Sequence, residues 1–157
     1  MQTRRDVLSR SAQVATLLAA IGLLPGLAQA QQAAGNFNAA AFSAKTMAEL
    51  LKTLGAGAPA ESKDVGITGP DIAENGAVVP IGASSSLPGV KRLLILVEKN
   101  PAVLAAMFDV TDAIDANIST RVKMGQSSNV FAVAMMNDGK VLFAQKEVKV
   151  TLGGCGG

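Results

Sequence analysis

Residues 129–150 read NVFAVAMM-NDG-KVLFAQKEVKV, two runs rich in apolar residues on either side of a turn. The turn is Asn137-Asp138-Gly139, and an Asp-Gly pair between such runs is a strong local signal for a tight hairpin. Alternate residues of the second run share one face, as they do in a strand, although the alternation of polarity is imperfect. We therefore expect two antiparallel strands, 129–136 and 140–150, paired through this turn.

Further short β segments precede the hairpin. They are separated by turns rich in Gly, Pro, Asn and Ser, and they occupy residues 65–68, 77–81, 91–98, 105–110 and 118–124. Strands at this regular spacing, with no helical crossover between them, favour an immunoglobulin-like β-sandwich. The sequence therefore predicts a mainly β fold.

One helix is expected before the strands. Apolar residues recur at spacings of three and four between Phe42 and Leu54, with Asn38 or Ser43 as the capping residue and Gly55 as the stop. The Gly-, Ala- and Pro-rich residues 55–62 that follow are expected to form a loop. The fold class is thus a sandwich with an N-terminal helix and a C-terminal arm, described below.

The first thirty residues have the features of an export signal. Thr3-Arg4-Arg5-Asp6-Val7-Leu8 is a twin-arginine pattern, a mildly apolar stretch follows, and Ala28-Gln29-Ala30 is a small-x-small cleavage site. The apolar stretch is too short and too broken to be a stable membrane span. We expect residues 1–30 to be removed on export to the periplasm, which leaves residues 31–152 as one domain.

Composition excludes several classes of function. The chain carries 14 basic and 12 acidic residues, but three of the basic and one of the acidic residues lie in the signal, so the exported chain has no formal net charge. It contains no His, Trp or Tyr, which argues against a nucleic-acid surface and removes the commonest general base and metal ligand. Phosphate-binding and dinucleotide-binding motifs are also absent. A self-contained hydrolase or oxidoreductase is disfavoured, and no cofactor or metal is expected.

Three groups of residues allow more than one interpretation. Thioethers bind soft metals such as copper, but scattered strand methionines usually fill the core, and we favour the core for Met107, Met124, Met135 and Met136. Turn and helix-start roles are favoured over a carboxylate site for Asp109, Asp112 and Asp115. The apolar segments 93–97 and 102–108 either fill the core or expose an edge to a partner, and we favour the core.

The single cysteine, Cys155, lies in the terminal run Gly153-Gly154-Cys155-Gly156-Gly157. Glycine has no Cβ, so the flanking pairs leave the thiol sterically accessible, and chain ends are seldom ordered unless something docks them. One cysteine forms neither an internal disulfide nor a CxxC pair. No Lys, Arg or helix N-terminus nearby in the sequence lowers the pKa of the thiol. We expect residues 153–157 to be a flexible arm that presents Cys155 to enzymes that supply the chemistry.

Together these features resemble the SoxY family, the sulfur carriers of bacterial thiosulfate oxidation. The resemblance covers the chain and rests on the twin-arginine signal, on Pro70-Asp71-Ile72-Ala73-Glu74-Asn75-Gly76 before a β stretch, and above all on the terminal pentapeptide. It implies an immunoglobulin-like sandwich, a heterodimer with a SoxZ-like subunit in the periplasm, and covalent attachment of sulfur to Cys155. The swinging arm would consist of Gly153, Gly154, Gly156 and Gly157.

The resemblance also implies transient enzyme partners. A haem enzyme, SoxAX, would join thiosulfate oxidatively to Cys155, and a metal-dependent hydrolase, SoxB, would release sulfate. A sulfane dehydrogenase, SoxCD, would oxidise the persulfide that remains. The chain itself would be a covalent carrier subunit and not an enzyme, in agreement with its lack of His.

Two other functions stay open at the level of sequence. An exported thiol redox or binding module would form mixed disulfides through Cys155. A carrier activated at its terminal carboxylate would use Gly156-Gly157 instead of the thiol, but such chemistry belongs to the cytosol, so the export signal counts against it.

Overall fold

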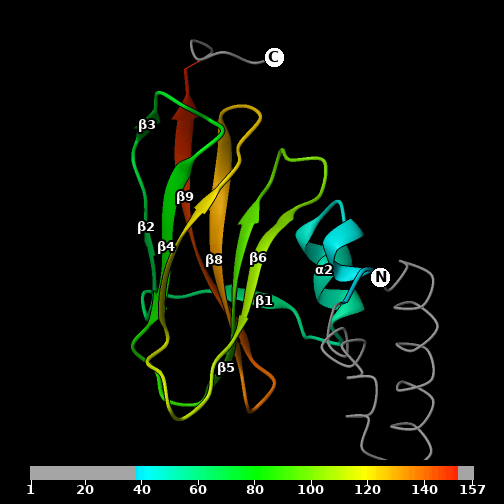
Figure 1. Cartoon of the computed structure of the whole chain (residues 1–157). Coiled ribbons are helices and arrows are strands. Elements are labelled where there is room, and N and C mark those ends of the chain that lie inside the picture. Colours follow the sequence, from blue (N-terminus) through cyan, green and yellow to red (C-terminus); the bar gives the residue numbers. More distant parts are fainter. Residues whose placement is uncertain (1–37, 152–157) are drawn as a thin grey trace, which may run out of the picture. The chain divides into compact units, whose positions relative to one another are not determined.

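The computed structural model describes residues 38–151, so the signal segment 1–30 and the arm 153–157 lie outside the described residues (Figure 1). The expected hairpin is present: β8 (Ser128–Met136) pairs antiparallel with β9 (Val141–Val150). Gly139 has a φ of 88° and completes the turn, which explains why glycine is found there. The sequence prediction of this hairpin is confirmed.

The strands form two sheets. The larger sheet has six strands, in the order β1-β9-β8-β5-β6 with β3 added beside β9, and the smaller has the order β2-β4-β7. The remaining strands are β1 (Pro59–Glu61), β2 (Val65–Thr68), β3 (Ile72–Ala73), β4 (Val79–Ser85), β5 (Val90–Val97), β6 (Leu104–Asp109) and β7 (Asn117–Val122). The immunoglobulin-like sandwich that the sequence predicts is therefore confirmed.

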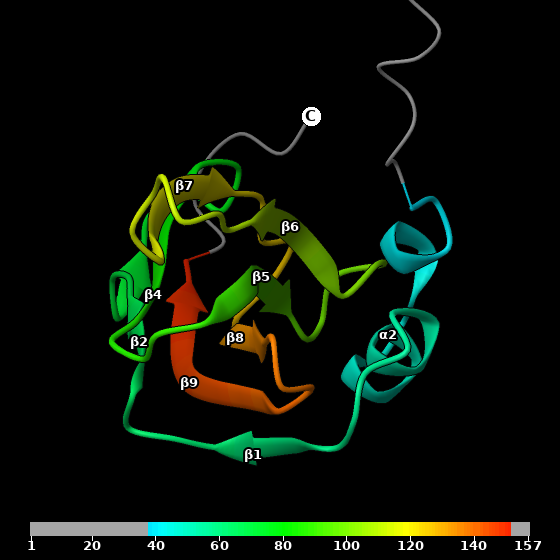
Figure 2. The same cartoon turned by 90° about the horizontal axis from the view of Figure 1, so that it is seen from below.

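Two apolar clusters lie on opposite faces of the larger sheet, and Figure 2 shows the resulting layers: the small sheet, the large sheet and the helical segment. β5 contributes to both clusters, because Leu93 and Ile95 face the small sheet whereas Leu94 and Leu96 face the helical segment. All residues from Leu93 to Val97 are fully buried. This segment fills the core, as the sequence analysis favours.

The N-terminal helical region differs from the single helix that the sequence predicts. It consists of a short 3-10 helix, η2 (Ala41–Ser43), and an α-helix, α2 (Met47–Thr53). Thr46 is the N-cap of α2, since its side chain accepts a hydrogen bond from the amide of Glu49. The predicted cap at Ser43 is therefore wrong, but the predicted stop is confirmed: Gly55 follows the helix with a φ of 66°.

Two strands were not expected from the sequence. β1 lies in the predicted loop 55–62, and β3 lies between the predicted strands 65–68 and 77–81. Both pair in parallel with β9, β1 with its beginning and β3 with its end. Within residues 38–151 no helix has the length and apolarity that crossing a membrane requires.

Candidate functional site

The predicted attachment site, Cys155, and the arm glycines Gly153, Gly154, Gly156 and Gly157 lie outside the described residues. The structure does describe the strand that leads to them. β9 ends at Val150, and Thr151 is the last described residue, four positions before Cys155. The candidate site is therefore built from the groups that hold the end of β9.

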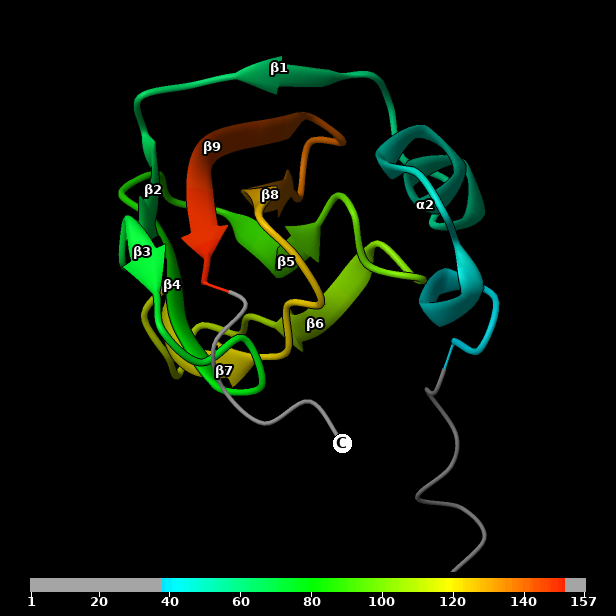
Figure 3. The same cartoon turned by 90° about the horizontal axis from the view of Figure 1, so that it is seen from above.

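β3 holds one edge of the end of β9. Ile72 pairs in parallel with Lys149, and Ala73 pairs with Val150 (Figure 3). The amide of Lys149 donates to the carbonyl of Asp71 at 2.9 Å, and the amide of Thr151 donates to the carbonyl of Ala73 at 3.1 Å. The backbone is thus fixed as far as Thr151 on this side.

Ser127 holds the opposite edge. The amide of Val150 donates to Ser127 Oγ at 2.9 Å, and this hydroxyl lies 3.5 Å from the carbonyl oxygen of Val150, to which it donates in turn. Successive amides at the end of β9 therefore find acceptors on alternate sides: Lys149 and Thr151 donate to the carbonyls of Asp71 and Ala73, and Val150 donates to Ser127. Backbone amides that point alternately to partners on the two sides are typical of a strand inside a sheet. The end of β9 is therefore paired on both sides.

A close approach at Gly76 completes these contacts. Its carbonyl accepts a hydrogen bond from the amide of Met124 at 2.7 Å. A Cβ at position 76 would overlap the carbonyl oxygen of Met124 and come within 2.8 Å of Val150 Cγ1. Only glycine fits between the loop and the strand without displacement. We call Asp71, Ile72, Ala73, Gly76 and Ser127 the β9 clamp.

An ion pair lies on the surface of the β9 clamp. Lys146 Nζ is 2.8 Å from Asp71 Oδ1, and the Asp71 side chain is 90% exposed. The hydrogen bond from Lys146, together with its charge, lowers the pKa of the Asp71 carboxyl. The exposure of the pair makes it a weak contributor to stability, because solvent screens the attraction.

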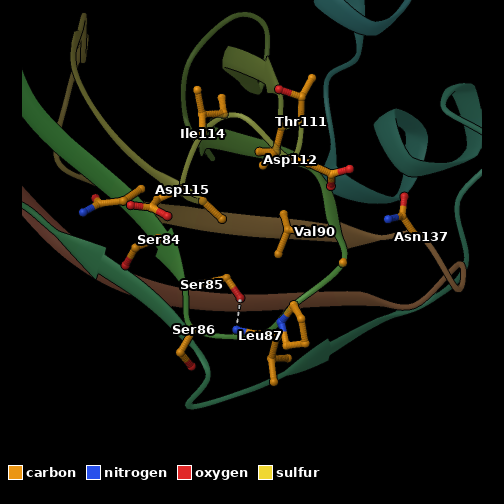
Figure 4. Close-up of a pocket in the computed structure, with 15 residues that line it drawn as sticks. Ser84, Ser85, Ser86, Leu87, Val90, Thr111, Asp112, Ile114, Asp115 and Asn137 are labelled. Atoms are coloured by element: carbon orange, nitrogen blue, oxygen red, sulfur yellow. Dashed lines mark hydrogen bonds between the residues drawn. The ribbon is translucent and has the colours of Figure 1, made fainter.

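The opposite end of the sandwich carries a cavity of about 590 Å³ (Figure 4). It lies beside the turn before β9, lined by the loops 84–90 and 110–117 together with Asn137. Two of the three aspartates that the sequence analysis considered, Asp112 and Asp115, are on this loop, whereas Asp109 pairs with Arg92. The amide of Ile114 donates to the carbonyl of Thr111, so the expected turn role is confirmed for Asp112, whereas Asp109 ends strand β6 and no helix begins here.

The methionines belong to the core. Met124 is buried between the sheets with Met136 packed against that cluster, whereas Met107 and Met135 pack against the cluster on the helical side. The four thioethers are thus divided between two faces of the large sheet. Among residues 38–151 no group of three His, Cys, Asp or Glu side chains is placed to hold a metal ion.

Comparison with known proteins identifies the family of this chain. A protein-family model described as "Sulfur oxidation protein SoxY" matches residues 50–155, a range that includes the β9 clamp and Cys155. The chain belongs to the SoxY family. A solved structure, the sulfur carrier protein SoxY from Chlorobium limicola f thiosulfatophilum, is 34% identical in sequence with a TM-score of 0.59, over 66% of this chain and 93% of that chain.

More distant solved structures share the fold with this SoxY-family chain. A substituted form of the superoxide reductase (neelaredoxin) from Ignicoccus hospitalis is 15% identical with a TM-score of 0.50, over 55% of this chain and 79% of that one. At this identity the likeness concerns the fold alone. No curated protein sequence matches the chain.

Sequence reasoning selected the terminal pentapeptide but missed Ser127 and the strand at Ile72. Ser127 falls between the predicted strands 118–124 and 129–136, where a serine is an ordinary turn residue and gives no distinctive signal. The better signal is the segment from Pro70 to Gly76, which the family resemblance rests on and which supplies four of the five residues of the β9 clamp. Its two-residue strand is too short to show a periodic pattern.

Proposed function

We propose that this chain carries sulfur covalently on Cys155 during periplasmic thiosulfate oxidation and presents it to the enzymes of the Sox system. The observation that carries this proposal is the match of the SoxY family model through residue 155, which brings the single thiol of the chain within the family's own pattern. The 34% identity to a structure named as a sulfur carrier supports the same role.

The β9 clamp supports the carrier role. Backbone hydrogen bonds fix the chain at Thr151, so the thiol is tethered by a segment of known length. Four residues span at most about 14 Å when fully extended, which defines the region that Cys155 can reach. In this proposal the catalytic groups belong to the partner enzymes, and the chain supplies the thiol and its tether.

In the proposed cycle every intermediate is attached to one thiolate, that of Cys155. Loading by SoxAX joins the Cys155 sulfur to the outer sulfur of thiosulfate, and an electron pair passes to the haem enzyme. SoxB then adds water to the terminal sulfonate, which releases sulfate and leaves a persulfide on Cys155. SoxCD removes electrons from the persulfide and adds oxygen from water to give a sulfonate, and SoxB hydrolyses this sulfonate to regenerate the thiol. A SoxZ-like subunit completes the carrier as a heterodimer.

Two variants separate this function from that of a carrier activated at its terminal carboxylate. Cys155→Ser should abolish sulfate release from thiosulfate by the reconstituted enzymes, because no sulfur can be attached, whereas one residue added after Gly157 should leave much of the activity. A carrier activated at the carboxylate would behave in the opposite way, with activity in the serine variant and none in the extended chain. Circular dichroism and co-purification of the partner subunit serve as controls for folding.

A further inference from the structure

The turn between β3 and β4 contains an asparagine followed by a glycine, Asn75-Gly76 (Figure 1). This is the single Asn-Gly pair in the sequence. Asparagine is a thermolabile residue, because the backbone nitrogen of the next residue can attack its side-chain amide. A glycine in that next position leaves the path of attack open, since it has no Cβ. The Asn75 side chain is also exposed, so water has access to it.

Two backbone amides in this turn are placed to favour the attack. The amide of Ala77 donates to Oδ1 of Asn75 at 2.9 Å. Negative charge develops on this oxygen when a nucleophile adds to Cγ, so a donor that already points at it lowers the barrier. The nucleophile is the amide of Gly76, which has no hydrogen-bond acceptor among residues 38–151. No bond to a described residue therefore has to break before this amide reacts.

We propose that Asn75 deamidates spontaneously through a succinimide and that the isoaspartate product displaces Gly76 from the β9 clamp. The nitrogen of Gly76 loses its proton and bonds to Cγ of Asn75, while the bond from Cγ to Nδ2 breaks and ammonia leaves with a proton. Water then opens the ring at either carbonyl, which gives aspartate or isoaspartate at position 75. The reaction consumes water and releases ammonia, and no oxidant or reductant takes part. It is independent of the role proposed for Cys155.

The surroundings of Gly76 explain why isoaspartate would disturb the β9 clamp. In isoaspartate the backbone runs through the side chain, which inserts an extra carbon atom immediately before Gly76. The carbonyl of Gly76 accepts a hydrogen bond from the amide of Met124 at 2.7 Å, and even a Cβ at position 76 would overlap the carbonyl oxygen of Met124. A longer backbone does not fit this contact. The hydrogen bond between Met124 and Gly76 is therefore lost in the isoaspartate form.

Mass spectrometry of the intact carrier complex tests the reaction. The complex is incubated at mildly alkaline pH and then cleaved briefly after its lysines, which releases peptide 64–91 with Asn75 as its only asparagine. Deamidation makes this peptide heavier by the difference between a hydroxyl and an amino group, and an isoaspartate-specific methyltransferase distinguishes the two products. Peptide 124–140 is the internal control, because it holds Asn129 and Asn137 but no Asn-Gly pair.

We expect the mass gain in peptide 64–91 and none in peptide 124–140. The rate in the folded chain should be about fivefold higher than in a synthetic peptide 64–91, since one hydrogen bond such as that from Ala77 supplies a factor of this size. Ala77→Pro removes the donor amide but keeps the Asn-Gly pair, so it should lower the rate to that of the synthetic peptide. A rate in the folded wild type no higher than that of the synthetic peptide would overturn the proposal, whether or not the proline variant folds.

The isoaspartate form, purified by chromatography, tests the effect on the β9 clamp. Its Met124 amide should exchange hydrogen about fivefold faster than in the unmodified chain, because the acceptor at Gly76 is displaced. Asn75→Asp is the matched control, since it carries the same added charge on an unaltered backbone, and it should exchange as the wild type does. Equal exchange of the Met124 amide in the isoaspartate form and in Asn75→Asp would overturn the displacement of Gly76.

Discussion

At the scale of single residues, the hydroxyl of Ser127 is the side-chain group that holds the end of β9. It meets both the amide and the carbonyl of Val150, the last residue of β9. A strand that ended without such a partner would leave its final amides to water and would fray. Ser127 thus holds the last residue of β9 on the side opposite β3.

Ser127→Ala should loosen the end of β9 without unfolding the domain. The amide of Val150 would lose its acceptor, at a cost of about 1 kcal/mol. We therefore expect hydrogen exchange at the amides of Val150 and Thr151 to become about fivefold faster, since exchange reports local opening. Ser86→Ala, at the other end of the sandwich, should leave both rates unchanged. Equal exchange rates in the two variants would contradict the role given to Ser127.

The Asp71–Lys146 pair predicts a local pH dependence. The hydrogen bond and charge of Lys146 lower the pKa of the Asp71 carboxyl in the folded state. The pair therefore stabilises the β9 clamp above the ordinary pKa of an aspartate, and this contribution disappears as the pH falls through the lowered pKa. An NMR titration of the Asp71 carboxyl should show the lowered pKa in the wild type and a return towards the ordinary value in Lys146→Gln. The same titration midpoint in both proteins would show that the pair does not form in solution.

At the scale of elements, the β8–β9 hairpin depends on one backbone conformation. Gly139 has a φ of 88°, and a Cβ there would meet no atom within 4 Å. Gly139→Ala therefore tests conformation alone, and we expect it to lower the free energy of unfolding by about 1–2 kcal/mol. In Gly57→Ala the new Cβ would only reach ordinary contact with the carbonyl oxygen of Gly139, at 3.8 Å. Urea denaturation of both variants would test the difference, and equal stabilities would contradict it.

The hairpin also shows which elements the sequence reveals. Its signal is local, because an Asp-Gly turn lies between two long β runs, and its position was predicted to within one residue at each end. β5 was predicted with similar accuracy, because its continuous apolar run is long enough to be recognised. The reason for that run, burial on both faces, became visible only when the helical segment was placed over Leu94 and Leu96.

The elements that the sequence missed depend on distant partners. β1 and β3 have three and two residues, and each becomes a strand only by pairing in parallel with β9, far along the chain. Residues of this kind carry no periodic pattern of their own. The helix break at Thr46 was also missed. Asn38, one of the two expected caps, accepts a hydrogen bond from the amide of Ala41 at the start of η2, whereas Thr46 caps the separate helix α2.

The candidate site was predictable in part. The pentapeptide around Cys155 was selected from its residue types, and the family match extends through residue 155. The groups that hold the end of β9 were not predictable, because Ala73 acts through its backbone carbonyl and Ser127 through a hydroxyl that has no distinctive signal in the sequence. Gly76 is the exception, since a glycine after Asn75 is a recognisable turn signal.

At the scale of the molecule, the cavity and the exit towards Cys155 lie at opposite ends of the sandwich. β9 runs from the hairpin turn to the β9 clamp, a length of about 30 Å for ten residues. The cavity with Asp112 and Asp115 lies at the first end, and the exit towards Cys155 lies at the second. In the proposed cycle the partner enzymes therefore approach the second end.

The central claim is that Cys155 carries the sulfur. Cleavage after Lys149 releases the peptide 150–157, which contains the only cysteine of the chain. We would measure the mass of this peptide, without reduction, in the intact carrier complex after incubation with thiosulfate and the haem enzyme. The account predicts a peptide heavier by one thiosulfate-derived S-SO₃ group, which becomes a persulfide after the hydrolase is added. A peptide that keeps its unmodified mass, or that carries only a glutathione or dimer disulfide, would contradict it.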